Sequence, residues 1–276
     1  MRLRAATLLV LFVPASACSR GDTETAPPEP TVATFTATDF AFAGPQELPA
    51  GVTTIRLLNR GTEPHHAVVA RLDSGKTAAD LAALAASNET EDPAWLVWVG
   101  GVSAIMPGDS AASTGMLTPG TYAVVCFISG PDGLPHVQKG MITSFQVTPA
   151  EGAMAAEPDA DLEIHMVDYA FELSQPLSAG THTIRVVNDG PQVHEVQLIR
   201  FAPGKTMEDM GAWMANPQGP PPAVALGGTG GLTAGQHNYI TVTLEPGEYA
   251  LICPVPDRED GRPHTAHGMV MPFSIS

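Results

Sequence analysis

The sequence predicts an all-β protein made of two tandem Greek-key β-sandwich domains, each with one short helix. Three observations predict this fold class. The chain of 276 residues repeats itself at an offset of 127 to 129 residues. Short alternating apolar and polar runs, rich in β-branched residues, are separated by turn residues, and the chain holds 27 Gly and 26 Pro. Only one segment per copy has a helical pattern.

The repeat defines the expected domains. Two copies of about 115 residues, a usual domain size, cover residues 32–148 and 161–276, and residues 149–160 (PAEGAMAAEPDA) link them. The matching segments are DFAF from 39 with DYAF from 168, GVTTIRLLNRG from 51 with GTHTIRVVNDG from 180, SGKT from 74 with PGKT from 203, Gly-Gly at 100 with Gly-Gly at 227, and PGTYAVVC from 119 with PGEYALIC from 246.

Four strand segments per copy are the clearest. The first of these segments is followed by a turn, since it ends in Asn-x-Gly. A helix is expected after the second segment, where a capping box begins at 77–80 in one copy and at 206–209 in the other. The expected strands are TTIRLLN from 53 and HTIRVVN from 182, HAVVARL from 66 and HEVQLIRF from 194, TYAVVCFI from 121 and EYALICPV from 248, and MITSFQV from 141 and MVMPFSI from 269.

The N-terminus indicates secretion. Residues 1–17 carry Arg2 and Arg4, then an apolar run over 5–13 that is too short to span a bilayer. Cys18, directly after Ala-Ser-Ala, resembles the acylated cysteine of bacterial lipoproteins. The alternative is an ordinary signal peptide cleaved before this cysteine. The polar, Pro-rich residues 18–31 are expected to be a tether.

The charge of the chain limits its partners. Thirteen Lys plus Arg against 29 Asp plus Glu give a formal net charge of −16. Nucleic acid and an anionic membrane surface both need a basic face, so neither is expected as a partner. We therefore expect an extracytoplasmic protein, in the periplasm or at the cell surface, that contacts the membrane only through its N-terminal lipid.

The same set of Cys, His and Met occurs in both copies. The first copy has the spacing C-x9-H-x4-M and the second has C-x10-H-x4-M, and each copy carries a further His early on a strand. Two His, one Cys and one Met are the ligands of blue-copper sites. The residues are His65, Cys126, His136 and Met141 in the first copy, and His194, Cys253, His264 and Met269 in the second.

With these residues in place, both copies resemble cupredoxins. The Pro-Gly-x-Tyr-x-x-x-Cys run is similar to the strand before the copper cysteine of plastocyanin-like proteins, and the ending His-x4-Met resembles pseudoazurin. The resemblance implies one or two type 1 copper ions, with thiolate and imidazole ligands and an axial thioether. Gly268 is expected to let the backbone pass close to the metal. The long Cys-to-His loop departs from small cupredoxins and resembles copper nitrite reductases.

Other readings of the cysteines remain open. Each copy has a single Cys, which deep burial or a disulfide between the copies would also explain. We expect a membrane-tethered electron carrier with a redox protein as partner. The alternative is a metal-free binding module or a copper-sequestering protein. His66 and His267 have no counterpart in the other copy and are expected to be exposed.

An enzyme is not expected from these residues. Copper nitrite reductases and small laccases share this two-domain outline, but their catalytic copper needs further histidines. Here Val125 and Ile252 precede the two cysteines, and no His-x-His pair occurs.

Overall fold

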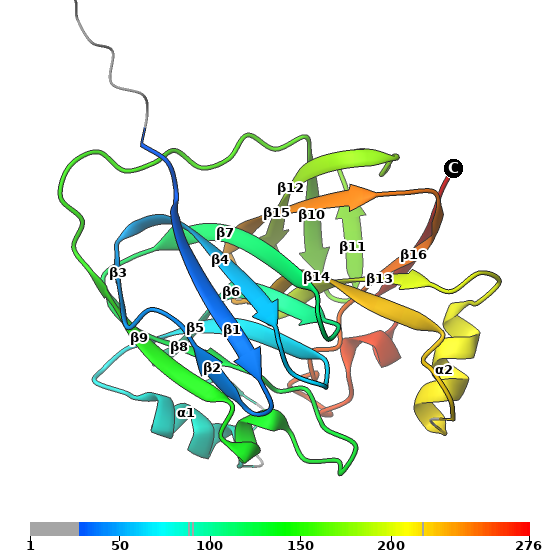
Figure 1. The fold of residues 1–276 in the computed structure, drawn as a ribbon, viewed down its shortest axis with the longest axis horizontal. Coiled ribbons are helices and arrows are strands. Elements are labelled where there is room, and N and C mark those ends of the chain that lie inside the picture. Colours follow the sequence, from blue (N-terminus) through cyan, green and yellow to red (C-terminus); the bar gives the residue numbers. More distant parts are fainter. Residues whose placement is uncertain (1–27, 88, 90, 217) are drawn as a thin grey trace, which may run out of the picture.

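The computed structural model describes residues 28–276 except 88, 90 and 217. The predicted signal peptide and Cys18 lie outside these residues, as does most of the tether. The described chain forms two large β-sheets and two short α-helices (Figure 1). The structure therefore confirms the predicted all-β, cupredoxin-like sandwich.

Each half of the chain contributes strands to both sheets. The first half forms β1 (Thr31–Thr38), β2 (Ala41–Ala43), β3 (Glu47–Pro49), β4 (Gly51–Asn59), β5 (His65–Leu72), β6 (Leu96–Ile105), β7 (Ser110–Leu117), β8 (Gly120–Val125) and β9 (Ile142–Thr148). The second half forms β10 (Leu162–Val167), β11 (Ala170–Leu173), β12 (Gly180–Asn188), β13 (His194–Phe201), β14 (Ala223–Leu232), β15 (His237–Leu244), β16 (Gly247–Ile252) and β17 (Val270–Ile275).

Both sheets run across the two halves. The eight-stranded sheet has the order β11-β10-β12-β15-β7-β4-β1-β2, and the nine-stranded sheet has the order β17-β16-β13-β14-β6-β5-β8-β9-β3. The halves meet where β15 pairs with β7 and where β14 pairs with β6, both antiparallel. The strands of each half thus pair with those of the other half in both layers. The division at residues 149–160 stays a prediction.

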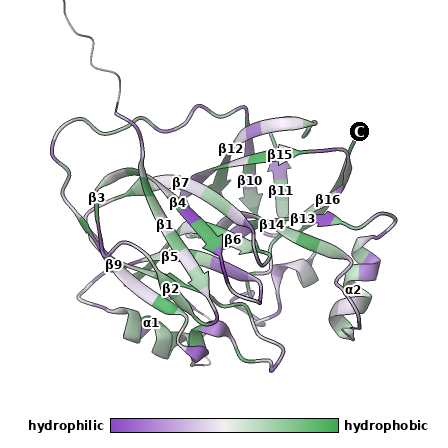
Figure 2. Cartoon of the chain, viewed as in Figure 1, coloured by the Kyte–Doolittle hydropathy of each residue, from purple (hydrophilic) through white to green (hydrophobic). Residues whose placement is uncertain are grey.

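Alternating burial gives each half its own core. β1, for example, buries Ala33, Phe35 and Ala37 and leaves the residues between them partly or fully exposed, as expected for a strand with one face on the core. Hydrophobic residues recur along the strands, as on β4 and β14 (Figure 2). The Tyr122 and Tyr249 rings are buried, and each hydroxyl donates to a carbonyl four residues earlier, at 2.8 and 2.9 Å.

One helix interrupts each half. Helix α1 (Ala78–Ala85) begins with a capping box between Thr77 and Asp80, and α2 (Met207–Ala215) begins with the same box between Thr206 and Asp209. Both capping boxes were predicted from the repeat. Neither helix, nor any other within the described residues, is long and apolar enough to cross a membrane.

Candidate metal sites

The first histidine of each site begins a strand, after a turn built on an asparagine. His65 begins β5 and His194 begins β13. Asn59 is completely buried; its amide donates to the carbonyl groups of Glu63 and Ile105, and its side-chain oxygen accepts from Gly61 N–H. Asn188 makes the equivalent bonds in the second half. The asparagine side chain of each Asn-x-Gly turn therefore fixes the backbone of the residues just before the histidine.

The cysteine and the second histidine come from one folded loop. Cys126 follows the last residue of β8, and His136 begins a short 3-10 helix, His136–Lys139. His136 N–H donates to Ile128 C=O, and Val137 N–H donates to Cys126 C=O, both at 2.8 Å. The second loop makes the same bonds, from His264 to Val255 and from Thr265 to Cys253.

The loops differ by one residue, and the difference lies at their tips. The first loop narrows at a bridge between Ser129 and Pro135, and the second at a bridge between Pro256 and Pro263. The extra residue of the second half is therefore inserted beyond the bridge. For this reason C-x9-H and C-x10-H bring the ligands to the same places.

Gly268 and its counterpart Gly140 each end a short 3-10 helix. Their φ angles are 98° and 95°, a left-handed conformation that favours glycine. A Cβ atom at either position would meet no atom within 4 Å. The glycine is thus needed for the turn of the backbone before the methionine, and the close approach of Gly268 to a metal stays a prediction.

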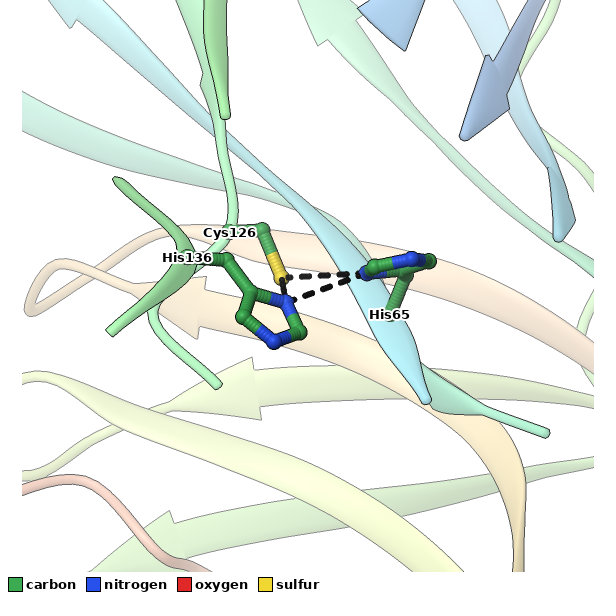
Figure 3. Close-up of side chains that lie close together, drawn as sticks. All are labelled: His65, Cys126 and His136. Carbon is green, nitrogen blue, oxygen red and sulfur yellow. Dashed lines mark hydrogen bonds between the residues drawn. The ribbon is translucent and has the colours of Figure 1, made fainter. Parts of the chain in front are cut away.

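His65, Cys126 and His136 form site one. Figure 3 shows both rings directing one nitrogen toward the sulfur. The His65 and His136 Nδ1 atoms lie 3.1 Å apart, and the Cys126 Sγ atom lies 3.5 Å from His136 Nδ1 and 4.0 Å from His65 Nδ1. All three side chains are completely buried. Three donor atoms from separate segments therefore converge on one point.

The spacing of these three atoms fits a metal ion. A triangle with sides of 3.1, 3.5 and 4.0 Å has a centre about 2.1 Å from each corner, close to the bonds of about 2.0–2.1 Å to imidazole and about 2.3 Å to thiolate that zinc makes. An ion at this centre would reach all three atoms without rearrangement.

His194, Cys253 and His264 form site two with the same plan. Cys253 Sγ lies 3.4 Å from His264 Nδ1 and 3.9 Å from His194 Nδ1. All three are again completely buried, and one donor atom from each lies within 4.8 Å of the others. Both sites therefore contain the three residues that the sequence singled out.

The methionines lie beside the cysteines. Met141 and Met269 are completely buried in the same cores as Cys126 and Cys253. Each cysteine N–H donates to the carbonyl of its methionine, at 3.1 and 3.2 Å. Their role as axial ligands stays a prediction. Cys126 and Cys253 are both free, so the disulfide between the copies does not form.

Carboxylates behind the histidines are the part of the site that sequence reasoning missed. Asp39 Oδ1 accepts from His65 Nε2 at 2.7 Å, Glu63 Oε2 accepts from His136 Nε2 at 2.9 Å, and Asp168 Oδ1 accepts from His194 Nε2 at 2.5 Å. Such partners orient metal-binding histidines. The repeated Asp-aromatic-Ala-Phe segment contained the signal for Asp39 and Asp168, but it was used only to define the repeat.

Burial favours the neutral form of the titratable ligands, which suits the imidazoles but not the thiols, since the thiolate is the form that binds a metal. Burial lowers the pKa of His65 and His194 and lowers that of His264 to about 4. A neutral ring that donates from Nε2 has a lone pair at Nδ1. In site one the lone pairs of two such Nδ1 atoms face each other and are shielded from water. This arrangement is unfavourable unless a cation or a proton lies between them. Burial also raises the pKa of the Cys126 thiol to about 12 and raises that of Cys253.

His66 is not exposed as predicted. It is 8% exposed, and its Nε2 atom accepts a hydrogen bond of 2.6 Å from the N–H of Phe127, next to Cys126. Its counterpart Glu195 is also buried, accepts from Ser103 in the other half, and donates its backbone N–H to Cys253 Sγ at 3.4 Å. Strand β5 is buried on both faces, because one face lies in the core of its own half and the other packs against α1 and side chains of β6 and β8.

A cavity borders both sites. It has a volume of about 850 Å³ and includes residues from both halves. Phe127 and Pro135 in its lining are chain neighbours of Cys126 and His136, and Glu195 is a chain neighbour of His194. The ligands themselves are buried, so these neighbours form the boundary between each site and the cavity.

The fold and its two His-Cys-His groups define a cupredoxin-like protein with two candidate metal sites. Among solved structures, the chain is similar to auracyanin from Roseiflexus castenholzii, with 22% identity, a TM-score of 0.32, and coverage of 44% of this chain and 98% of that one. It is also similar to a multicopper oxidase, with 16% identity, a TM-score of 0.25, and coverage of 89% and 88%. No family model and no curated protein matches the chain.

The prediction that the chain is not an enzyme is overturned by the same comparison. Besides the multicopper oxidase, the chain is similar to the copper-containing nitrite reductase of Thermus scotoductus, with 12% identity, a TM-score of 0.25, and coverage of 89% of this chain and 61% of that one. The solved structures to which the chain is similar thus include enzymes.

Proposed function

We propose that the chain binds one type 1 copper ion in each half and transfers electrons through these sites. The observation that carries this proposal is the convergence of two Nδ1 atoms and one Sγ atom on a common centre in site one, with the same residues in site two. Copper would supply a one-electron couple, Cu(II)/Cu(I), at each site.

The donor set favours copper over other metals. A trigonal His₂Cys group with a weak axial thioether is the arrangement of blue-copper electron-transfer sites. Asp39 and Asp168 hold His65 and His194 with Nδ1 toward the sulfur, and burial of the ligands excludes water from the centre. Ligands that are held in place by hydrogen bonds and shielded from water need little rearrangement when the charge of a bound ion changes. A small rearrangement favours electron transfer.

The setting proposed for this activity is extracytoplasmic. The signal-like N-terminus and Cys18 support a lipid anchor in a bacterial membrane, with residues 18–31 as tether. The net charge of −16 supports a partner other than nucleic acid, and we propose a redox protein.

Copper loading of the purified full-length chain tests the function. We expect two copper ions per chain, an intense visible thiolate-to-copper band, and a narrow copper hyperfine splitting in electron paramagnetic resonance. Cys126→Ser and Cys253→Ser should each remove one half of the band, because an alcohol is a poor soft ligand, and the double variant should be colourless.

The same titration can contradict the proposal. Stoichiometric copper without colour would indicate a copper-sequestering protein, and no bound copper would indicate a metal-free module. Thr53→Ala, which removes a buried hydroxyl whose hydrogen bond goes to the backbone of Gly51, is the control and should keep the full band.

A further inference from the structure

The two sites differ in what lies behind the second histidine. In site one His136 Nε2 donates to Glu63 Oε2 at 2.9 Å. In site two His264 Nε2 is buried and has no hydrogen-bond partner among the described residues. The nearest carboxylate oxygen paired with it, Asp257 Oδ2, lies 3.9 Å away.

One difference in sequence accounts for this asymmetry. Glu63 and Gln192 occupy the same position, four residues after Asn59 and Asn188, whose amides bind their carbonyl groups. The Gln192 amide cannot carry the negative charge of Glu63. It donates instead to Asp257 Oδ2 at 2.9 Å.

Asp257 does not replace Glu63, because other donors already surround it. Its Oδ2 atom accepts from the Tyr169 hydroxyl at 2.5 Å as well as from Gln192, and its Oδ1 atom accepts from the backbone of Glu259 and Asp260 at 2.8 and 3.2 Å. These bonds lower the pKa of Asp257 and hold the side chain away from the imidazole.

A carboxylate that accepts from the far nitrogen of a ligating imidazole makes the ring a stronger electron donor. A stronger donor stabilises Cu(II) relative to Cu(I). Site one has two such imidazoles, at His65 and His136, and site two has one, at His194. The backbone N–H of Glu195 donates to Cys253 Sγ, and the backbone N–H of the equivalent residue, His66, acts in the same way on Cys126, so this contact does not distinguish the two sites.

We propose that Glu63 sets the reduction potential of site one below that of site two. This inference rests on the proposed function. An electron supplied to the fully oxidised protein would therefore be held at site two. Its transfer from site one oxidises Cu(I) to Cu(II) at site one and reduces Cu(II) to Cu(I) at site two. Glu63 is a positioning residue, since it acts on the ion through His136.

Two buried carboxylates favour the opposite order. One is Asp257, which lies 3.9 Å from His264 Nε2 without a hydrogen bond to it, and the other is Glu195. It is bound to Ser103 at 3.2 Å and contacts Cys253 only through its backbone N–H. Its carboxylate therefore acts on site two through space, without a bond to an imidazole. Glu195→Gln separates its contribution from that of Glu63.

Single-site variants allow each potential to be measured alone. Cys253→Ser leaves only site one and Cys126→Ser leaves only site two, so the visible band can be followed in spectroelectrochemical titrations. We expect site one to have the lower potential. Glu63→Gln in the first background should raise the potential by at least the equivalent of a tenfold change in the Cu(I)/Cu(II) ratio, about 59 mV for one electron. Gln192→Glu in the second should lower it.

The controls separate tuning from loss of structure. Glu47→Gln removes an exposed carboxylate of the same half on β3 and should leave the potential of site one unchanged. Glu63→Asp keeps a carboxylate at this position, so it should raise the potential of site one less than Glu63→Gln does. If Glu63→Gln keeps its band and copper content but moves the ratio less than twofold, the inference is wrong while the proposed function stands. If no variant shows a band, the proposed function itself fails.

Discussion

Val102 lies opposite Thr229 where the two halves of the nine-stranded sheet meet, and these residues are 127 positions apart. They therefore occupy the same place in the repeat. Ser113 and Ile240, which face each other in the eight-stranded sheet, are equivalent in the same way. Both joins thus pair a strand with its own counterpart, antiparallel, as a two-fold axis requires. The halves form one hydrogen-bonded body.

Cutting the linker should therefore leave the halves together. Residues 149–160 are mostly exposed and contain no strand, so a protease site can be placed there. We expect the two fragments to elute as one species and to unfold in one transition. Fragments that separate in native buffer would contradict this.

A buried hydrogen-bonded contact between the halves provides a substitution that should weaken their association. Gln197 Oε1 accepts from Ser103 Oγ at 2.6 Å and from Ala104 N–H at 2.7 Å. Gln197→Ala leaves the Ala104 N–H unpaired, while Ser103 can still donate to Glu195. The loss should cost about 1–3 kcal/mol of the free energy of unfolding. Denaturant titration of the cut and uncut proteins measures this loss.

Replacing the predicted axial ligand should change the potential of site two and leave its copper in place. In the Cys126→Ser background, Met269→Leu keeps the size of the side chain and removes a weak donor to Cu(II), so the potential should rise. Met271→Leu, two residues along and partly buried against the same core, is the control. Equal potentials in both variants would remove Met269 from the ligand set. Met141→Leu should affect site one only.

The lipid anchor is tested by fractionation. If Cys18 is acylated, the expressed protein should partition with membranes, and Cys18→Ala should be unprocessed or soluble. Wild-type protein that is wholly soluble and cleaved elsewhere would refute the anchor.

The capping box of α1 should make stability depend on acidity. Hydrogen bonds from Thr77 and Lys76 lower the pKa of Asp80 from 3.8 to about 2. Because the folded-state value is depressed, this stabilisation is present above pH 3.8 and is lost as the pH falls toward 2. Asp80→Asn should thus lower the melting temperature at pH 6, and the difference from wild type should disappear near pH 2. Glu208→Gln on α2, outside any capping box, should show no such convergence.

The sequence predicted the parts of the fold that repeat. Equivalent segments reveal the strands, both capping boxes and the residues of both sites, because a ligand that recurs at the same place in two copies stands out from single histidines and cysteines. The spacing also placed the second His after a loop whose tip tolerates an extra residue.

What the sequence did not predict depends on contacts between distant segments. Glu63 lies 73 positions from His136, and nothing in the local pattern links them. The position of Gln192 was known from the repeat, but its effect on Asp257 required the loop to be placed. His66 is likewise in contact with Phe127, which lies 61 positions along the chain.

The free edges of the two sheets differ from the edges that join the halves. The outer strands β2 and β3 have three residues each and β11 has four, and β17 carries Pro272, all features that discourage further pairing. The joining strands β6, β7, β14 and β15 have eight to ten residues and no proline. A single copy would leave such long edges open to another molecule. The chain that carries both copies closes these edges within itself. The pairing that a single copy would have to make with a second molecule is therefore independent of protein concentration here.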